Sequence, residues 1–167
     1  MKRSKLVTVL AATCALAATI STTAFAEEKK EERNVRGVYG GAGLGPAFHQ
    51  GGNTELAWRF MAWIRPYKYL SLEAGYFNLR DNSRGDKTDG FALSGVPTYP
   101  IGPFDIYAKI GFAVATINGN TELDPTFGGG GAYQWKRLGG RVEYERFQFD
   151  RTADVVWFLL YYQLGEI

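Results

Sequence analysis

The sequence is almost without cysteine and histidine. Cys14 and His49 are the only residues of these types, and Cys14 lies in an N-terminal segment that we expect to be removed. The remaining chain then has neither a disulfide nor a thiol nucleophile. With one histidine and no acidic cluster spaced like a calcium loop, the residues give no basis for a metal site. We expect no metal, no cofactor and no catalytic residue.

Long apolar runs are also scarce, and the only one stands near the N-terminus. Lys2, Arg3 and Lys5 precede an apolar run over 6–20, which ends in the residues STTAFA. A transmembrane helix needs about 20 apolar residues, whereas a basic start, a short apolar run and a small-x-small end are typical of a signal peptide. We therefore expect residues 1–26 to be a cleaved signal peptide. Loss of its three cations changes the formal net charge from +2 to −1, which removes the basic surface that a nucleic-acid binder needs.

The chain that follows has the composition of a β protein. Residues 27–34 are charged and have no apolar face, so we expect a disordered tail there. The whole sequence contains 11 Phe, 10 Tyr, 4 Trp and 21 Gly. Aromatic residues favour strands, and glycines favour turns and bends between them. We expect a single β domain over residues 35–167.

The hydrophobic pattern predicts eight strands, most of them about ten residues long. That length suits a tilted strand that crosses a bilayer better than the shorter strands usual in soluble sheets. Short turns follow the second, fourth and sixth strands, and longer polar loops follow the others. This order is typical of an up-and-down outer-membrane barrel. The expected strands are 35–47, 54–64, 70–79, 90–98, 104–117, 126–135, 138–149 and 154–164.

Apolar and charged residues alternate within these strands. In the seventh strand Val142 and Tyr144 share one face, and the other face carries Arg141, Glu143 and Glu145. Successive side chains of a strand point to opposite faces, so one face is apolar and the other is ionic. The interior of an eight-stranded barrel is just wide enough for side chains to fill. We therefore expect the inward set to interlock as an ionic core rather than to line a channel. That set is Glu55, Arg59, Glu73, Lys109, Arg141, Glu143 and Glu145.

Alternation alone does not say which face is inside, because a soluble sandwich would place the apolar face in its core. The aromatic residues favour the membrane alternative. They gather at both ends of the strands, as amphipathic rings do at the two interfaces of a bilayer. The expected belt at the turn end is Trp63, Tyr67, Tyr69, Tyr99, Phe104 and Trp135, and the expected belt at the loop end is Phe48, Phe77, Phe127, Phe149 and Trp157.

Three segments carry a resemblance to a known family: 70–76 (LSLEAGY), 107–111 (YAKIG) and 138–144 (LGGRVEY). Over 35–164 the chain resembles the small eight-stranded outer-membrane barrels, which include OmpA-like transmembrane domains, OmpX and the opacity-type surface proteins. The resemblance implies an all-β fold, an eight-stranded antiparallel up-and-down transmembrane β-barrel, in the bacterial outer membrane. Such barrels commonly end on an aromatic assembly signal, whereas this sequence ends in LGEI. We expect no periplasmic domain after the last strand, so the expected closer analogue is OmpX.

The resemblance speaks to fold more than to function. We expect a non-enzymatic integral outer-membrane protein that contributes to envelope integrity and makes surface contacts through its loops. Its expected partners are outer-membrane lipid, lipopolysaccharide and the outer-membrane assembly machinery, with no nucleic acid.

Two other functions stay open. Among eight-stranded barrels, the lipid A palmitoyltransferase type has a histidine in the first outer loop and an aspartate with a serine in the next. Here His49, Asp81 and Ser83 hold those places. The lipid A deacylase type does not fit, because its His-x-Ser motif is replaced by ERF at 145–147. The second alternative is a soluble periplasmic β-barrel that binds a small apolar ligand.

Overall fold

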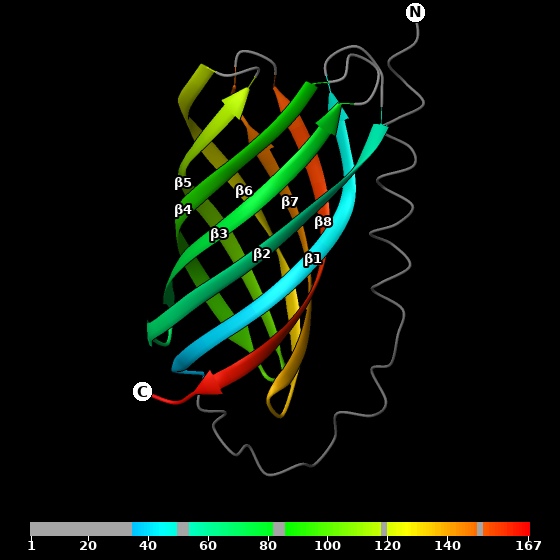
Figure 1. Ribbon diagram of the computed structural model, residues 1–167. Helices are drawn as coiled ribbons and strands as arrows, with labels where there is room; N and C mark the ends of the chain where they lie inside the picture. The colour runs from blue at the N-terminus through cyan, green and yellow to red at the C-terminus, as the bar shows by residue number, and fades with distance from the viewer. Residues whose placement is uncertain (1–34, 50–53, 82–85, 118–119, 150–151) are drawn as a thin grey trace, which may run out of the picture. The chain divides into compact units, whose positions relative to one another are not determined.

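The computed structural model describes residues 35–49, 54–81, 86–117, 120–149 and 152–167. Within them the chain forms eight antiparallel strands, each paired with its neighbour in sequence, and β1 pairs with β8 to close a barrel (Figure 1). The expected up-and-down barrel is confirmed. No helix that could cross a membrane lies in this part of the chain. The strands are β1 (Gly37–His49), β2 (Thr54–Tyr67), β3 (Leu70–Asp81), β4 (Asp86–Ile101), β5 (Phe104–Ile117), β6 (Asn120–Trp135), β7 (Leu138–Phe147) and β8 (Ala153–Gly165).

The expected signal peptide over 1–26 and the expected tail over 27–34 lie outside the described residues.

Three tight turns lie at one end of the barrel, between β2 and β3, β4 and β5, and β6 and β7. In the second of them Gly102 has a φ of 60°, a conformation that glycine adopts without steric cost. Lys136 has a φ of 55° in the third turn, and its carbonyl accepts a hydrogen bond from the Gln134 side chain at 2.8 Å. We call this the turn end, and the opposite end the loop end.

Five strands run further toward the loop end than the hydrophobic pattern predicts, β1, β3 and β8 by one or two residues and β4 and β6 by four and six. β4 begins at Asp86 instead of 90, and β6 begins at Asn120 instead of 126. The longer β6 pairs with β5 through Phe112 and Pro125 and beyond. Pro125 is tolerated because the regular ladder between β6 and β7 starts only at Thr126, and its carbonyl still accepts a hydrogen bond from the Gln148 backbone N–H at 3.2 Å. Strand length here follows backbone pairing rather than side-chain hydrophobicity. In the opposite sense, β7 ends at 147 instead of 149.

Closure of the barrel brings β1 close to β8, where β1 carries small inward residues. A Cβ at Gly43 would lie 2.6 Å from Leu159 Cγ and 2.7 Å from the Phe158 carbonyl oxygen. Glycine at this position therefore lets the Leu159 side chain occupy the lumen next to the β1 backbone.

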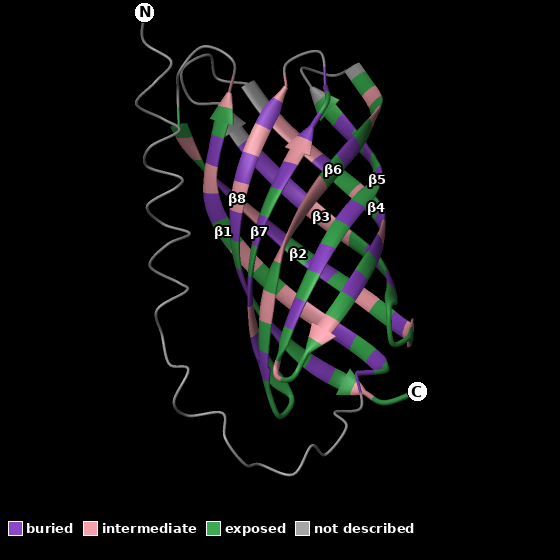
Figure 2. Cartoon of the chain, turned by 180° about the vertical axis from the view of Figure 1, so that it is seen from behind, coloured by how far each residue is buried: buried purple, intermediate pink, exposed green. Residues whose placement is uncertain are grey.

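The two faces of the wall differ in chemistry as well as in burial. Buried and exposed residues alternate along the strands (Figure 2). The inward residues are charged and polar groups together with aromatic and mostly small aliphatic side chains, and the outward residues between the two rims are mostly aliphatic or aromatic. The large apolar side chains that are more than half exposed include Leu44, Leu56, Phe60, Leu72, Phe91, Leu93, Ile106, Ile110, Phe112, Leu123, Val142, Phe158 and Leu160.

Candidate functional site in the lumen

Six charged side chains from four strands meet inside the barrel. They come from β2, β3, β5 and β7, and each sits at an inward position of its strand. Every one of them is at most 6% exposed, so the cluster is shielded from solvent. Three are cations and three are carboxylates, which makes the cluster formally neutral. We call it the ionic cluster, and its members are Arg59, Glu73, Lys109, Arg141, Glu143 and Glu145.

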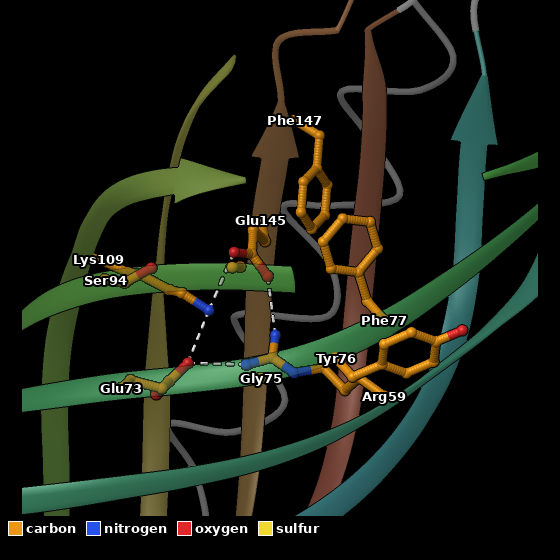
Figure 3. A pocket seen from close by; sticks show the side chains of 10 residues that line it. Arg59, Glu73, Gly75, Tyr76, Phe77, Ser94, Lys109, Glu145 and Phe147 are labelled. Atoms are coloured by element: carbon orange, nitrogen blue, oxygen red, sulfur yellow. Dashed lines mark hydrogen bonds and ion pairs between the residues drawn. The ribbon is translucent and has the colours of Figure 1, made fainter. Parts of the chain in front are cut away.

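Arg59 is the hub of the ionic cluster. Its Nη2 lies 2.8 Å from Glu73 Oε1, and its Nη1 lies 2.8 Å from both Glu143 Oε1 and Glu145 Oε2. Figure 3 shows the guanidinium between the carboxylates of Glu73 and Glu145. One cation from β2 therefore bonds to carboxylates of β3 and β7. Buried charges are costly unless they are paired and hydrogen-bonded, and here the geometry supplies both.

The other two cations complete the network. Lys109 Nζ lies 2.7 Å from Glu73 Oε1, 3.2 Å from Glu143 Oε1 and 2.9 Å from Glu145 Oε1. Arg141 Nη1 lies 2.7 Å from Glu73 Oε2, and its Nη2 forms a short ion pair with Glu143. Each carboxylate thus meets at least two cations, which is a far stronger arrangement than an isolated surface pair.

Two aromatic side chains, Tyr107 and Trp157, make hydrogen bonds and ring contacts with the ionic cluster. The Tyr107 hydroxyl donates to Glu143 Oε2 at 3.0 Å and accepts from Arg141 Nε. Trp157 Nε1 donates to Glu145 Oε2 at 3.1 Å, and the ring of Trp157 lies 5.1 Å from the Arg59 guanidinium carbon. These contacts fix the rotamers of the charged residues and add cation–π stabilisation in a region without bulk water.

Glu55 is the one member of the expected ionic core that lies apart. It precedes Arg59 by four residues on β2, which places it about 13 Å nearer the loop end. Its side chain is half-buried rather than enclosed. The alternation of residues along β2 predicts which face of the strand carries Glu55, but not how far along the barrel axis its side chain lies from the other charges.

An apolar layer lies between the ionic cluster and the loop end. Phe77 and Phe147 have ring centroids 4.7 Å apart, and Phe147 and Phe149 stack at 5.7 Å. The expected outward belt was therefore wrong for Phe77, Phe149 and Trp157, which are buried in the lumen. The sequence contained a signal for the first two, because Phe77 has the parity of Glu73 and Phe149 has that of Glu145. At the same end Phe48 and Phe127 face outward as expected.

The lumen below the ionic cluster, toward the turn end, is closed by an aromatic stack and by polar pairs. Tyr39 stacks on Trp63 at 5.1 Å, and Tyr161 meets the same tryptophan edge-on at 5.1 Å. Trp63 is therefore inside, which corrects the expected outward position. Arg65 Nη1 lies 3.0 Å from Asp105 Oδ2, with both side chains buried. Side chains therefore fill most of the lumen that the structure describes, and two small cavities remain between them.

Two small cavities flank Glu73. In the first, the centre of a water molecule can occupy about 10 Å³, and the lining includes Arg59, Ser94 and Lys109. The second holds about 30 Å³ and lies nearer the turn end, against Arg65 and Arg141. These volumes suit one or a few waters and are far below the few hundred Å³ of a small-molecule pocket.

The residues of the expected acyltransferase-like alternative fall at the loop end. His49 is half-buried at the last position of β1, where its backbone is opposite Ala153. Asp81 ends β3, but its side chain and the whole of Ser83 lie outside the described residues. Among the side chains that are described, no group of three or more His, Cys, Asp or Glu is placed to hold a metal ion.

The outer surface at the turn end carries the expected aromatic belt. Tyr67, Tyr69, Tyr99, Phe104 and Trp135 are all exposed there, between 45% and 68%. Tyr69 and Tyr99 stack with centroids 6.3 Å apart.

Comparison with solved structures finds several small β-barrel proteins of bacteria. Neisserial surface protein A is 14% identical, with a TM-score of 0.59 over 76% of this chain and 97% of that chain. The N-terminal β-barrel domain of Pseudomonas aeruginosa OprF is 8% identical, with a TM-score of 0.61 over 76% of this chain and 97% of that chain. Ail, the attachment invasion locus protein of Yersinia pestis, solved with the heparin analogue sucrose octasulfate, is 12% identical, with a TM-score of 0.51 over 77% and 98%.

The chain therefore has the fold of the small eight-stranded outer-membrane barrels. No protein-family model matches the sequence, and the comparison with curated protein sequences gives no match.

Proposed function

We propose that this protein is an integral barrel of the bacterial outer membrane, with a closed lumen and no enzymatic activity. The observation that carries the proposal is the inversion of the usual pattern of a soluble protein. Ionic groups such as Arg59 and Glu143 are enclosed at the centre, while Ile110 and Leu160 are each 69% exposed on the outer wall. In water such a surface would be a large aggregation-prone patch, whereas in a bilayer it contacts hydrocarbon at little cost.

The barrel architecture supports the same proposal. Every strand pairs on both sides, so the wall has no open edge, which is the condition for a sheet to cross hydrocarbon. The turn-end belt of Tyr67, Tyr99 and Trp135 would lie at one membrane interface. Orientation follows the rule for such barrels, with tight turns toward the periplasm and loops outward.

The proposed contribution is to envelope integrity and to surface contacts made by the loops. Its proposed partners are outer-membrane lipid, lipopolysaccharide and the assembly machinery of that membrane. The complex of Ail with sucrose octasulfate supports the idea that a barrel of this fold can bind a soluble ligand. We propose no specific ligand for the loops of this chain.

The two alternatives are supported less. A soluble carrier of an apolar ligand needs an apolar cavity, but the lumen centre is ionic and its cavities have room only for water. A lipid A acyltransferase needs His49, Asp81 and Ser83 to converge, and of these three side chains the structure describes that of His49 alone.

Cell fractionation tests the main proposal. We expect the protein in the outer-membrane pellet, and we expect its migration on a gel to change when the sample is heated. Recovery in the soluble periplasmic fraction would favour the carrier. Lipid A from cells that express His49→Ala is expected to be unchanged, and a loss of one acyl chain relative to wild type would favour the enzyme.

A further inference from the structure

The turn end of the barrel carries exposed cations next to its exposed aromatic rings. Lys136 and Arg137 form the turn between β6 and β7, Lys68 lies in the turn between β2 and β3, and Arg36 precedes β1. All four side chains are exposed. We call them the basic turn rim.

Two of these cations sit directly on belt residues. Lys136 Nζ lies 5.2 Å from the ring centroid of Trp135, and Lys68 Nζ lies 5.8 Å from that of Tyr69. Both rings are more than half exposed on the outer wall. Each pair therefore presents a positive charge at the level where an amphipathic ring meets the headgroups of a bilayer.

The turns are built so that these side chains point away from the lumen. Arg65 donates to the Lys68 carbonyl at 2.7 Å from the inside, and Gln134 donates to the Lys136 carbonyl at 2.8 Å. In each turn, a buried side chain thus donates the hydrogen bond that the lysine carbonyl needs. The lysine side chain is then left at the outer rim.

The charge at this end is unbalanced. Among the described residues of the turn end, the exposed carboxylate is that of Glu166, while Asp105 is buried against Arg65. Four exposed cations thus face one exposed side-chain carboxylate among the residues that the structure describes at this end.

We propose that the basic turn rim binds the phosphate-bearing headgroups of anionic phospholipids. The proposal rests on the membrane location argued above and adds a lipid preference at one rim. A lysine or arginine near a membrane surface gains about 1 kcal/mol from anionic lipid, which is about fivefold in local lipid association. Aromatic rings beside the cations fix their depth, so the charge lies at phosphate level rather than in free solution.

Tryptophan fluorescence offers a site-specific test. Trp63 and Trp157 lie in the lumen, so Trp58 and Trp135 are the two tryptophans on the outer wall. In Trp58→Phe protein, Trp135 alone reports the lipid beside the basic turn rim. This protein is reconstituted in vesicles of phosphatidylcholine and phosphatidylglycerol, with bromine on the acyl chains of one lipid or the other at equal mole fraction.

We expect brominated phosphatidylglycerol to quench Trp135 more strongly, with a relative association constant about fivefold above that of phosphatidylcholine. Lys68→Gln, Lys136→Gln and Arg137→Gln together should bring the ratio toward one, as should high salt. Lys136→Arg should keep the preference. Equal quenching by the two lipids, or an excess that survives the triple substitution, would overturn the proposal.

Trp58 supplies the matched control from the other half of the barrel. In Trp135→Phe protein the reporter is Trp58, whose ring lies 5.5 Å from Tyr76, near the carboxylate of Asp89. No preference for phosphatidylglycerol is expected there. A preference at both tryptophans would mean a general effect and would also overturn the proposal. If neither brominated lipid quenches either tryptophan, the outer wall is not in hydrocarbon and the membrane location itself fails.

Discussion

Arg141 Nη1 lies 2.7 Å from Glu73 Oε2, although the two residues are 68 positions apart in the sequence. They belong to β7 and β3, which stand four strands apart in an eight-stranded ring. The ion pair therefore crosses the lumen and ties opposite walls together. Since both cavities are also lined by Glu73, this side chain separates the two spaces that a water molecule could occupy.

The ionic cluster should be sensitive to loss of one charge. Arg59→Met leaves three buried carboxylates with two cations, and we expect the free energy of unfolding to fall by about 3–5 kcal/mol. Urea unfolding in lipid vesicles, followed by gel migration of unheated samples, measures the change. Arg59→Met with Glu145→Gln restores neutrality and should recover part of the loss. Arg137→Met, at an exposed turn position, should change stability by about 0.5 kcal/mol or less. An equal effect of the two methionine variants would contradict the enclosed cluster.

The filled lumen predicts that purified protein in a planar bilayer shows no stable open channel. Glu73→Ala with Arg141→Ala keeps the cluster neutral but removes the bridge between the two cavities. We expect this double variant to raise ion leakage severalfold above wild type, because water-filled space then continues past the middle of the barrel. Val142→Ala, on the outer face of the same strand, is the control and should leave leakage unchanged. A large wild-type conductance would refute the closed lumen.

The outer wall should respond to charge according to depth. Ile110 is at the middle of β5 and 69% exposed, whereas Ile101 ends β4 beside a turn. In a bilayer, Ile110→Arg is expected to cost about 2–4 kcal/mol of unfolding free energy, and Ile101→Arg about 0–1 kcal/mol. Unfolding from vesicles by urea gives both values. In a soluble barrel neither arginine would be costly, so equal small effects would argue against membrane insertion.

Two neighbouring glycines of β7 offer a test of the inward and outward assignment. A Cβ at Gly139 would lie 2.1 Å from Tyr161 Cζ, in the aromatic stack of the lumen, whereas at Gly140 its nearest neighbour is 3.9 Å away. We expect Gly139→Ala to destabilise by about 1–3 kcal/mol through displaced packing. Gly140→Ala should be neutral or stabilising by a few tenths of a kcal/mol, because it restricts the unfolded chain. The reverse order in thermal or urea unfolding would mean that β7 is assigned to the wrong faces.

The sequence pattern predicted the two faces of several strands, but it did not predict where every strand begins. The faces of β3, β5 and β7 were predicted correctly because each alternates charge with apolar side chains around Glu73, Lys109 and Glu143. The starts of β4 and β6 were missed, since residues 86–89 and 120–125 are mostly polar. Backbone pairing with β3 and β5 extends these strands, and side-chain hydrophobicity carries no record of such pairing.

The inward and outward faces of β8 could not be assigned from the sequence of this strand alone. ADVVWFLLYYQLG is apolar on both faces over most of its length, so a one-residue shift would leave its pattern almost the same. Pairing of Gly43 with Leu159 and of Glu143 with Trp157 decides the matter, because it places both of those β8 side chains in the lumen. Trp157 then meets Arg59 and Glu145, a contact that no local pattern predicts.

The sequence by itself determined the class of fold, the number of strands and the face on which most charges lie, because two-residue periodicity is a local property of a strand. Only the tertiary structure decided which charges meet, that Glu55 stands apart from the ionic cluster, and which of the large aromatic rings fill the lumen. Those outcomes depend on strand stagger and on closure of β1 against β8, which bring together residues that are distant along the chain.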